Sequence, residues 1–301
     1  MLNIKKIISF LLISLTFYAC GESSVEIGQN TYSPKIVIDG LLYPGNKVEN
    51  IRITRNIPLN TQLEPEQVIL FAADVKLQDM QNGNIYQLTF NPTNVAFEYN
   101  GNDLEIGYDK SYKLSVAAYV DGNLLQASSI TKTPNAGFRI NDSESYIDSI
   151  KYQEKDDNGN DKQLFVKFAP SPGTNYYAIS IVALDASLDN FIYDNSYFEV
   201  KPKDLEKDFD RYKYQFRWLQ NVNSSSNNIE YQVEWLNVWF YSRYRMIIYA
   251  ADDNYRLFAQ THRNVQEFDG NFHEPRMNIE GDGIGVFGSA ITDTVYFKVI
   301  K

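Results

Sequence analysis

The sequence predicts an all-β protein made of two tandem β-sandwich domains, and three observations support this. Apolar residues recur at every second position in several short segments, which is the period of a half-buried strand. Turn clusters rich in Asn, Asp and Gly separate these segments. Aromatic residues make up 14% of the chain, with 22 Tyr and 18 Phe but 1 Cys. These counts predict a core of aromatic and β-branched side chains without disulfides.

The start of the chain predicts a secretory signal peptide over residues 1–19. Two lysines precede an uncharged apolar run over residues 7–17, which is shorter than the roughly 20 residues of a membrane-spanning helix. The segment ends at Ala19, and Cys20, the only cysteine, follows directly. This ending resembles the lipobox of bacterial lipoproteins, in which the signal is cut before the cysteine and the thiol is joined to a diacylglycerol. The resemblance implies a lipid anchor at Cys20 rather than a buried free thiol.

The polar residues 20–32 predict a tether between the lipid and the first domain. No second long apolar run follows them, so no transmembrane helix is expected. The 301 residues of the chain are enough for two domains of ordinary size. The formal net charge is −10, and because an acidic surface repels phosphate backbones, nucleic acid is a poor candidate for a partner.

We expect the first domain over residues 33–134. Its strongest signal is a hairpin over residues 73–90, whose Asn-Gly turn supplies the positive φ angles that a tight hairpin needs. A second hairpin, with an Asp-Gly turn, is expected over residues 111–130. Short strands at this spacing without a long helical pattern are typical of a β-sandwich. Their order resembles the transthyretin-like sandwich, an immunoglobulin-like architecture.

We expect the second domain over residues 145–301, after a Pro- and Gly-containing boundary. A Tyr-rich strand that follows a Pro-Gly turn at residues 170–181 resembles a fibronectin type III-like strand pair. One or two short helices are expected, over residues 252–265 and, as helix or loop, over residues 203–212. The acidic turn at residues 155–162 offers calcium ligands, but it lacks the downstream Glu of an EF-hand loop, which favours a plain hairpin turn.

All three tryptophans, Trp218, Trp235 and Trp239, lie in the most aromatic part of this second domain. Aromatic residues occur there at every second position, over residues 212–218 and 231–235. Two interpretations stay open. The row is either a platform that stacks on sugar rings or the inward face of a sandwich, and the period of two favours the inward face. The three tryptophans are therefore candidates for ligand binding.

A motif near the C-terminus consists of Phe272, Glu274, Pro275, Asn278, Gly283, Gly285, Phe287 and Gly288. Together with an Ile-Val-Ile-Asp-Gly opening near residue 38 and a strand–helix run over residues 245–265, it resembles a Bacteroidota lipoprotein family catalogued as a domain of unknown function, number 4249. The resemblance covers nearly the whole mature chain. Members are often encoded beside TonB-dependent outer-membrane receptors, which implies an accessory role in nutrient capture. No catalytic residue is implied.

Taken alone, the glycines predict a bulged and tightly packed edge strand.

The sequence favours a protein that is not an enzyme and needs no cofactor or metal. The chain has 2 His, which are His262 and His273, and it lacks Gly-x-Ser-x-Gly and His-Glu-x-x-His motifs. His273-Glu274 is a weak metal candidate without a further ligand at helical spacing. A hydrolase that uses a carboxylate pair stays open as a third hypothesis, because spacing in the sequence does not reveal such pairs.

The first hypothesis is therefore an outer-membrane protein that is anchored by its lipid, on the periplasmic or the surface face. It would bind to a TonB-dependent receptor and assist it in nutrient uptake. A glycan-binding surface lipoprotein that uses the tryptophan region is the alternative.

Overall fold

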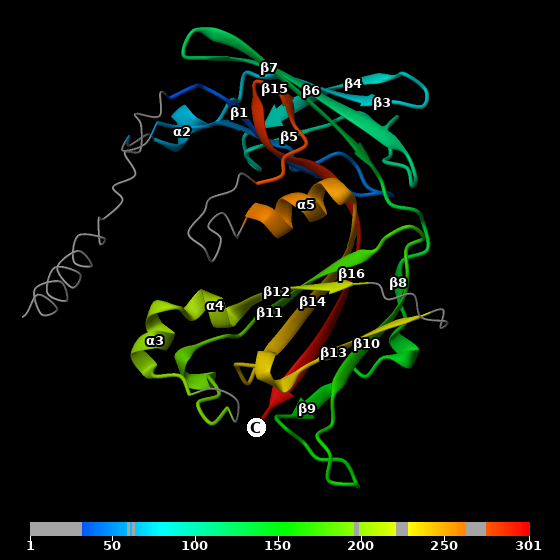
Figure 1. Cartoon of the computed structure of the whole chain (residues 1–301), viewed down its shortest axis with the longest axis vertical. Coiled ribbons are helices and arrows are strands. Elements are labelled where there is room, and N and C mark those ends of the chain that lie inside the picture. The colour runs from blue at the N-terminus through cyan, green and yellow to red at the C-terminus, as the bar shows by residue number, and fades with distance from the viewer. Residues whose placement is uncertain (1–31, 59–60, 62–63, 196–198, 221–227, 263–274) are drawn as a thin grey trace, which may run out of the picture. The chain divides into compact units, whose positions relative to one another are not determined.

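The computed structural model describes residues 32–58, 61, 64–195, 199–220, 228–262 and 275–301 (Figure 1). The predicted signal peptide, the predicted lipid attachment at Cys20 and nearly all of the tether lie outside the described residues. Pro34–Lys301 form one unit of contacting elements. Among the described residues, no helix is both long and apolar enough to cross a membrane.

The unit consists mainly of β-strands, which confirms the predicted fold class. The described strands are β1 (Ile36–Leu42), β2 (Arg52–Arg55), β3 (Asp74–Asp79), β4 (Ile85–Asn91), β5 (Ala96–Glu98), β6 (Ser111–Val120), β7 (Asn123–Lys132), β8 (Arg139–Ile140), β9 (Ser149–Lys151), β10 (Leu164–Ala169), β11 (Tyr176–Ala183), β12 (Tyr214–Gln220), β13 (Ile229–Val233), β14 (Arg243–Ala251), β15 (Glu280–Gly281) and β16 (Gly283–Ile300). The described helices are α2 (Pro65–Val68), α3 (Pro202–Lys207), α4 (Phe209–Lys213) and α5 (Asp253–His262), with 3₁₀ turns η1 (Asp142–Glu144), η2 (Leu188–Asn190) and η3 (Trp235–Asn237). The segment that the sequence left open between helix and loop forms α3 and α4.

The described strands pair into three sheets. One has the order β12-β11-β14-β16-β1-β2, with β9 added beside β16. The second has the order β13-β10-β8, and the third has the order β15-β7-β6-β3-β4-β5. Strand β16 pairs in parallel with β1 near its start and antiparallel with β14 over its later part. The last strand is therefore central to the first sheet.

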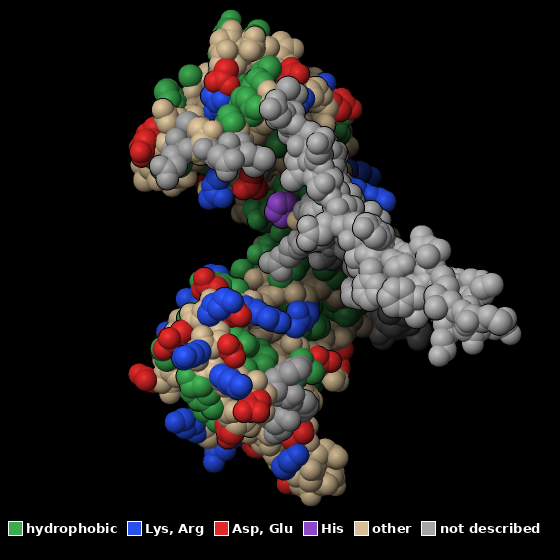
Figure 2. Space-filling view, turned by 60° about the vertical axis from the view of Figure 1, so that its left-hand side comes forward, with side chains coloured by type: hydrophobic (Ala, Val, Ile, Leu, Met, Phe, Trp, Pro, Cys, Tyr) green, Lys and Arg blue, Asp and Glu red, His purple; other side chains and the backbone are tan. Residues whose placement is uncertain are grey.

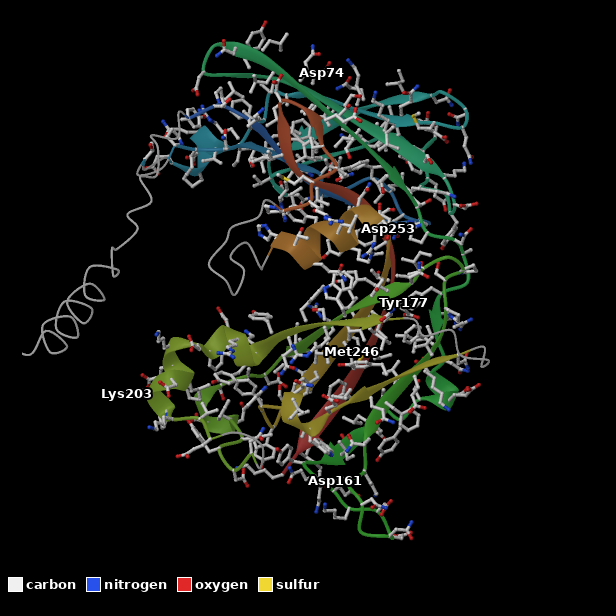
Figure 3. All side chains as sticks on the ribbon, in the orientation of Figure 1. Asp74, Asp161, Tyr177, Lys203, Met246 and Asp253 are labelled. Carbon is white, nitrogen blue, oxygen red and sulfur yellow. The ribbon has the colours of Figure 1, made fainter. Side chains whose placement is uncertain are left out.

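Two hydrophobic clusters fill the space between these sheets. One gathers the inward side chains of β1–β7, and it also contains Phe287 of β16. The other gathers side chains of β8–β14 with Phe297 from the far end of β16. Tyr177 and Met246, labelled in Figure 3, lie on the neighbouring strands β11 and β14 in this second cluster. Because β16 contributes to both clusters, its first half packs with strands that the sequence assigned to the first domain.

The structure confirms both predicted hairpins, and local turn chemistry explains why. The turn between β3 and β4 contains Gly83 at a φ of 78°, and the turn between β6 and β7 has Asp121 and Gly122 at 51° and 82°. Positive φ is easy for glycine and tolerated by aspartate. The strands that flank each turn then alternate in burial, so that one face of each hairpin contributes to the core.

The acidic turn before β10 is a plain hairpin turn, as the sequence favoured. One carboxylate oxygen of Asp156 accepts hydrogen bonds from the backbone amides of Asn158 and Asn160, at 2.8 and 2.9 Å. Lys162 pairs with Glu154 and Lys155 with Asp161. The carboxylates of Glu154, Asp156 and Asp161 are thus bound by groups of the protein itself. The described part of the chain holds no cluster of three or more His, Cys, Asp or Glu side chains suited to a metal ion.

Charges of both signs are interspersed on the surface. On the face drawn in Figure 2, Lys and Arg side chains are intermixed with Asp and Glu side chains.

Tyr244 on β14 offers a test of the second core. Its hydroxyl donates to the carbonyl of Phe240 at 2.8 Å and accepts from the amide of the same residue at 3.0 Å, and burial raises its pKa. Tyr244→Phe keeps the ring stacked on Phe297 but leaves two buried backbone groups unpaired. We expect a loss of about 1–3 kcal/mol in the free energy of unfolding, measured by urea denaturation. The control Tyr296→Phe, at a side chain that is 61% exposed, is expected to change little. Equal stability of the two variants would contradict this role.

The ion pair between Asp185 and Arg243 predicts a pH dependence. The Arg243 guanidinium donates to the carboxylate at 2.8 and 2.7 Å and lowers the pKa of Asp185 from 3.8 to about 2. A lowered pKa means that the unfolded chain binds the proton more readily. The pair's stabilisation is therefore present above the unfolded pKa and is lost as pH falls from 3.8 to about 2.

Asp185→Asn is expected to make the urea midpoint fall less steeply over this acidic range than in the parent protein. Arg243→Gln should have the same effect, and combining the two substitutions should add nothing further. If the urea midpoint of the double variant changed with pH differently from that of both single variants, the two side chains would act independently.

Candidate functional site

The structure places the three tryptophans in three different environments. Trp235, in η3, is 2% exposed, and its indole N–H donates to the carbonyl of Lys162 at 2.9 Å. It belongs to the second hydrophobic cluster. Trp218, on β12, is half-buried with its ring edge-on to Phe216. Trp239 is half-buried and lies beside a cavity. The tryptophans therefore do not form a common platform.

The cavity beside Trp239 has a volume of about 660 Å³, and we call it the β12 cavity. Its walls come from the segment before α3, from α4, from β12 and from η3 with the residues after it. The lining residues are Glu199, Val200, Asp210, Arg211, Tyr212, Tyr214, Gln215, Phe216, Arg217, Leu236, Asn237 and Trp239. Its volume lies within the range of about 300–1,000 Å³ that is usual for small-molecule sites.

Local structure explains how these side chains meet. Strand β12 is an edge strand, paired only with β11 in the sheet order, and α4 leads directly into it (Figure 1). Pro202 at the first turn of α3 suits a helix start, because proline has no amide hydrogen to leave unpaired there. The short helices thus bring Tyr212 next to Trp239, with the two ring centres 4.9 Å apart.

One wall of the β12 cavity is aromatic and fixed in place. The ring of Trp239 stacks on Phe191, with centroids 6.0 Å apart and an interplanar angle of 15°. Tyr212 meets Trp239 nearly edge-on, at 67°. Packing on two sides restrains the indole.

The other wall is polar and hydrogen-bonded. Asn237 accepts from the Arg217 guanidinium at 2.8 Å and donates to Glu234 at 3.3 Å. The side-chain amide of Gln215 donates to the backbone carbonyl of Asn237. Gln215 is 9% exposed, and its Oε1 accepts no hydrogen bond from the described residues. A buried acceptor without a donor costs about 1–3 kcal/mol.

The lining is balanced in charge. Arg211 and Arg217 supply two positive groups, and Glu199 and Asp210 supply two negative groups. The lining thus combines aromatic rings, amides and charged groups of both signs. Such a set suits a ligand that has an apolar face and an edge that both donates and accepts hydrogen bonds.

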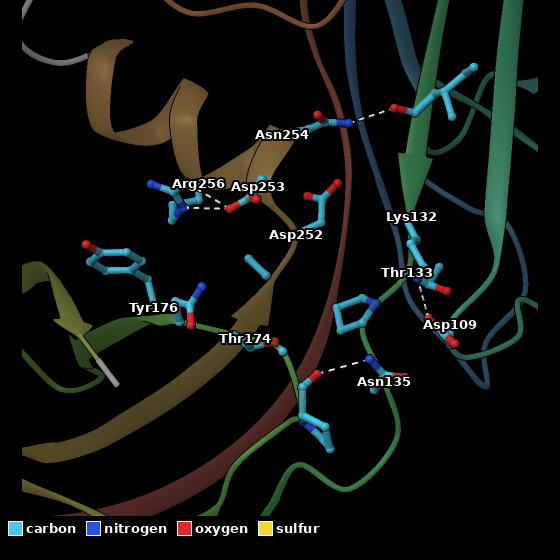
Figure 4. A pocket seen from close by; sticks show the side chains of 16 residues that line it. Asp109, Lys132, Thr133, Asn135, Thr174, Tyr176, Asp252, Asp253, Asn254 and Arg256 are labelled. Atoms are coloured by element: carbon cyan, nitrogen blue, oxygen red, sulfur yellow. Dashed lines mark hydrogen bonds and ion pairs between the residues drawn. The ribbon is translucent and has the colours of Figure 1, made fainter. Parts of the chain in front are cut away.

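A second cavity, of about 430 Å³, lies where the end of β7 meets the start of α5 (Figure 4). Its charged groups pair with one another. Lys132 and Asp109 are 2.7 Å apart, Arg256 and Asp253 are 2.8 Å apart, and the Arg256 guanidinium also lies over the ring of Tyr176. These pairs leave little for a ligand to replace, so we regard this cavity as a structural junction.

Asp252, at the same junction, explains how α5 is held. Its carboxylate accepts from the hydroxyl of Thr131 at 2.6 Å and from the amides of Tyr255 and Ser289 at 3.0 and 3.1 Å. Burial raises its pKa, and the Thr131 hydroxyl opposes that rise. The bond to Tyr255 caps the helix that the sequence predicts over residues 252–265, whereas those to Thr131 and Ser289 tie the helix to β7 and β16.

The C-terminal motif has a structural role where it is described. The side chain of Asn278 donates to the carbonyl of Phe287 at 2.9 Å and accepts from its amide at 3.4 Å. Phe287 is fully buried in the first cluster. An added Cβ at Gly283 would lie 2.5 Å from Ile279 and 2.6 Å from Ala127, and one at Gly288 would lie 2.9 Å from Asp252. Close packing is thus confirmed at these glycines.

The glycine-rich stretch pairs with a strand on one of its sides. Gly283–Ser289 pair in parallel with all of β1, whereas the described pairing between β14 and β16 covers Ala290–Lys298. Glycines there serve the close approach to β1. Pro275 precedes the paired segment, while Phe272, Glu274 and His273 lie outside the described residues. His262, at the end of α5, is exposed and stacks on Phe258.

Reasoning from the sequence missed the polar half of the β12 cavity, Gln215, Arg217 and Asn237. Gln215 and Arg217 alternate with the aromatic residues of β12, so the period of two did mark that they share a face. Nothing local pairs them with Asn237, which lies in η3, after β13. That contact exists only in the folded chain.

Comparison with known proteins agrees with the motif. A family model described as "Domain of unknown function (DUF4249)" matches residues 22–294. A search of curated proteins finds no match. Among solved structures, the crystal structure of the chicken CNTN1 FN1-FN3 domains is similar at 10% identity and a TM-score of 0.21. The match covers 88% of this chain, while the chain spans 65% of that structure. The family match extends over nearly the whole sequence, and the chain therefore belongs to the DUF4249 family.

Proposed function

We propose that this protein is a lipid-anchored binding protein of the outer membrane that assists a TonB-dependent receptor in nutrient uptake. The observation that carries the proposal is the β12 cavity, which has the volume and the mixed lining of a solute site. In this role the protein captures a solute and passes it to the receptor without chemical change, and it needs neither a metal nor a cofactor.

The N-terminal region supports the same proposal from the sequence side. A diacylglycerol on Cys20 supplies two chains, and stable anchoring takes more than one. The polar residues 20–32 then act as a flexible tether. Tethering a binding protein and a receptor to the same membrane raises their effective concentration, so that even a weak contact between them is populated.

The test is co-purification of the tagged full chain from outer membranes, with mass spectrometry of the proteins that accompany it and of the N-terminal peptide. We expect a diacylglycerol on Cys20 and a TonB-dependent receptor in near-stoichiometric amount. Cys20→Ser is the matched control, and it should be released from the membrane and lose the receptor. Recovery of the lipidated protein alone would refute a stable complex.

The same experiment separates anchoring from solute capture. Trp239→Ala alters the cavity but not the tether, so it is expected to keep both the lipid and the receptor. Loss of the receptor in this variant would indicate that the cavity itself is the contact surface.

A further inference from the structure

We propose that the end of the β6–β7 hairpin contacts the lipid surface of the membrane to which Cys20 anchors the chain. The apolar groups of this contact are Tyr119 and Leu124, and we call this pair the hairpin tip. The inference rests on the lipid anchor of the proposed function and adds a second contact with the same membrane. Three features of the described residues argue for it.

The first feature is an exposed apolar pair beside a polar turn. Tyr119 on β6 is 73% exposed, and Leu124 on β7 is 51% exposed. The two residues are direct partners across the strands, and such partners point to the same face of a sheet. Scattered apolar residues are ordinary on a protein surface, whereas adjoining ones mark a place where contact with an apolar phase lowers the free energy.

The second feature is the firm support of the hairpin tip. Val120 and Leu125, which follow the pair along each strand, are buried in the first hydrophobic cluster. The Arg55 guanidinium donates to both carboxylate oxygens of Asp121 in the turn, at 2.8 Å for one of them. Because this acidic group is paired, the tip meets a layer of lipid headgroups without bringing an unpaired charge.

The third feature is the place where the anchored segment joins the described unit. Strand β1 begins at Ile36, which pairs with Arg55 of β2, and Arg55 also binds Asp121. The start of β1 and the turn between β6 and β7 therefore lie at the same end of the unit, as Figure 1 shows. The 13 residues between Cys20 and Pro34 extend at most about 50 Å, so the lipid holds this end nearest to the membrane.

The chemistry of the pair suits a bilayer interface. A tyrosine places its ring among the upper acyl segments and its hydroxyl among the headgroups, which is why this residue is enriched at membrane interfaces. Leu124 buries aliphatic carbon in the same layer. Two side chains are too few to anchor a protein alone, so the hairpin tip orients a chain that the lipid already holds.

The experiment uses the lipidated full chain in vesicles of phosphatidylethanolamine and phosphatidylglycerol. Cys20 is the only cysteine and its thiol carries the lipid, so an introduced cysteine is the single site for a maleimide dye. Asn123→Cys places an NBD dye at the turn, and Lys132→Cys places it at the other end of β7, about 30 Å away. Lipids with a doxyl spin label near the headgroup quench a dye that lies within the bilayer.

We expect blue-shifted emission and about twofold or stronger quenching of the dye at position 123 relative to position 132. Adding Tyr119→Ser and Leu124→Ser together to the Asn123→Cys protein should remove most of this quenching. Adding Ile130→Ser instead is the matched control and should leave it unchanged. Ile130 is 50% exposed and lies on the same strand and face as Leu124, six residues nearer the other end. All three side chains are exposed, so these substitutions leave the core intact.

Equal quenching at the two labelled positions would overturn the contact, and so would quenching that the double serine variant retains. A dye that stays in water on vesicles but is shielded once the co-purified receptor is added would also overturn it, because the hairpin tip would then contact protein.

Flotation of the vesicles and mass spectrometry of the Cys20 peptide separate this inference from the proposed function. A lipidated chain that floats with the vesicles but shows no quenching at position 123 would refute only the hairpin contact. A chain without lipid at Cys20 would refute the anchor, and the hairpin contact with it.

Discussion

Gly285→Ala is expected to destabilise the protein by about 2–6 kcal/mol, which is enough to unfold much of a marginally stable chain. Gly285 has a φ of 108°, which side-chain-bearing residues rarely adopt, and a Cβ there would collide with the backbone carbonyl of Ile38. That carbonyl belongs to β1, which pairs with β16 through the same residues. The backbone cannot move away from the added Cβ without breaking the parallel pairing between β16 and β1.

Gly122→Ala is the matched control for this prediction. Gly122 also has a positive φ, of 82°, but nothing lies within 4 Å of an added Cβ. It therefore reports the conformational penalty alone, of the order of 1 kcal/mol. Urea denaturation followed by far-UV circular dichroism measures both variants. If Gly285→Ala were no less stable than Gly122→Ala, the close approach of β16 to β1 would be refuted.

Trp235→Ala is expected to cost about 3–5 kcal/mol, the usual range for removing a large buried aromatic side chain. The indole is almost fully buried, meets Tyr152 edge-on at 5.3 Å and donates its N–H to the carbonyl of Lys162. Its removal opens a cavity in the second cluster and leaves that carbonyl without its donor. The measurement is again the free energy of unfolding.

Trp218→Ala serves as the control, since Trp218 is half-buried on the edge strand β12, and a clearly smaller loss is expected. Comparable losses in the free energy of unfolding for the two variants would contradict the different burial of Trp235 and Trp218. The two variants therefore separate a tryptophan of the core from one at the strand surface.

Much of the fold could be predicted because its signals are local. The two hairpins depend on Asn-Gly and Asp-Gly turns, whose backbone preferences act within four residues. The helix cap at Asp252 is local in the same way, because its carboxylate reaches the amide of Tyr255, three residues along the chain. Alternation of apolar residues likewise marks one buried face on each strand. These local signals were enough to predict the all-β class.

Position within the sheet was not predictable in this way. Glycines in Gly283–Ser289 are compatible with an edge strand, a bulge or a close backbone approach. Only the tertiary structure showed that β1 is the strand that they approach closely. The motif residue Asn278 has no local partner that explains it. Its role emerges once the chain brings it beside both backbone groups of Phe287.

The candidate site likewise has features that the sequence predicts and contacts that only the folded structure shows. By itself, the sequence determined that the aromatic residues gather between residues 212 and 244 and that they alternate along strands. A period of two tells which side chains share a face, but both faces of a sandwich sheet can carry aromatics, and the period does not say which one is covered. Only the tertiary structure decided that Trp235 is core, that Trp239 lines a cavity, and that Gln215, Arg217 and Asn237 meet there. The physical reason is that burial and hydrogen bonding at this site arise from contacts between β12, α4 and η3, and no single segment contains them.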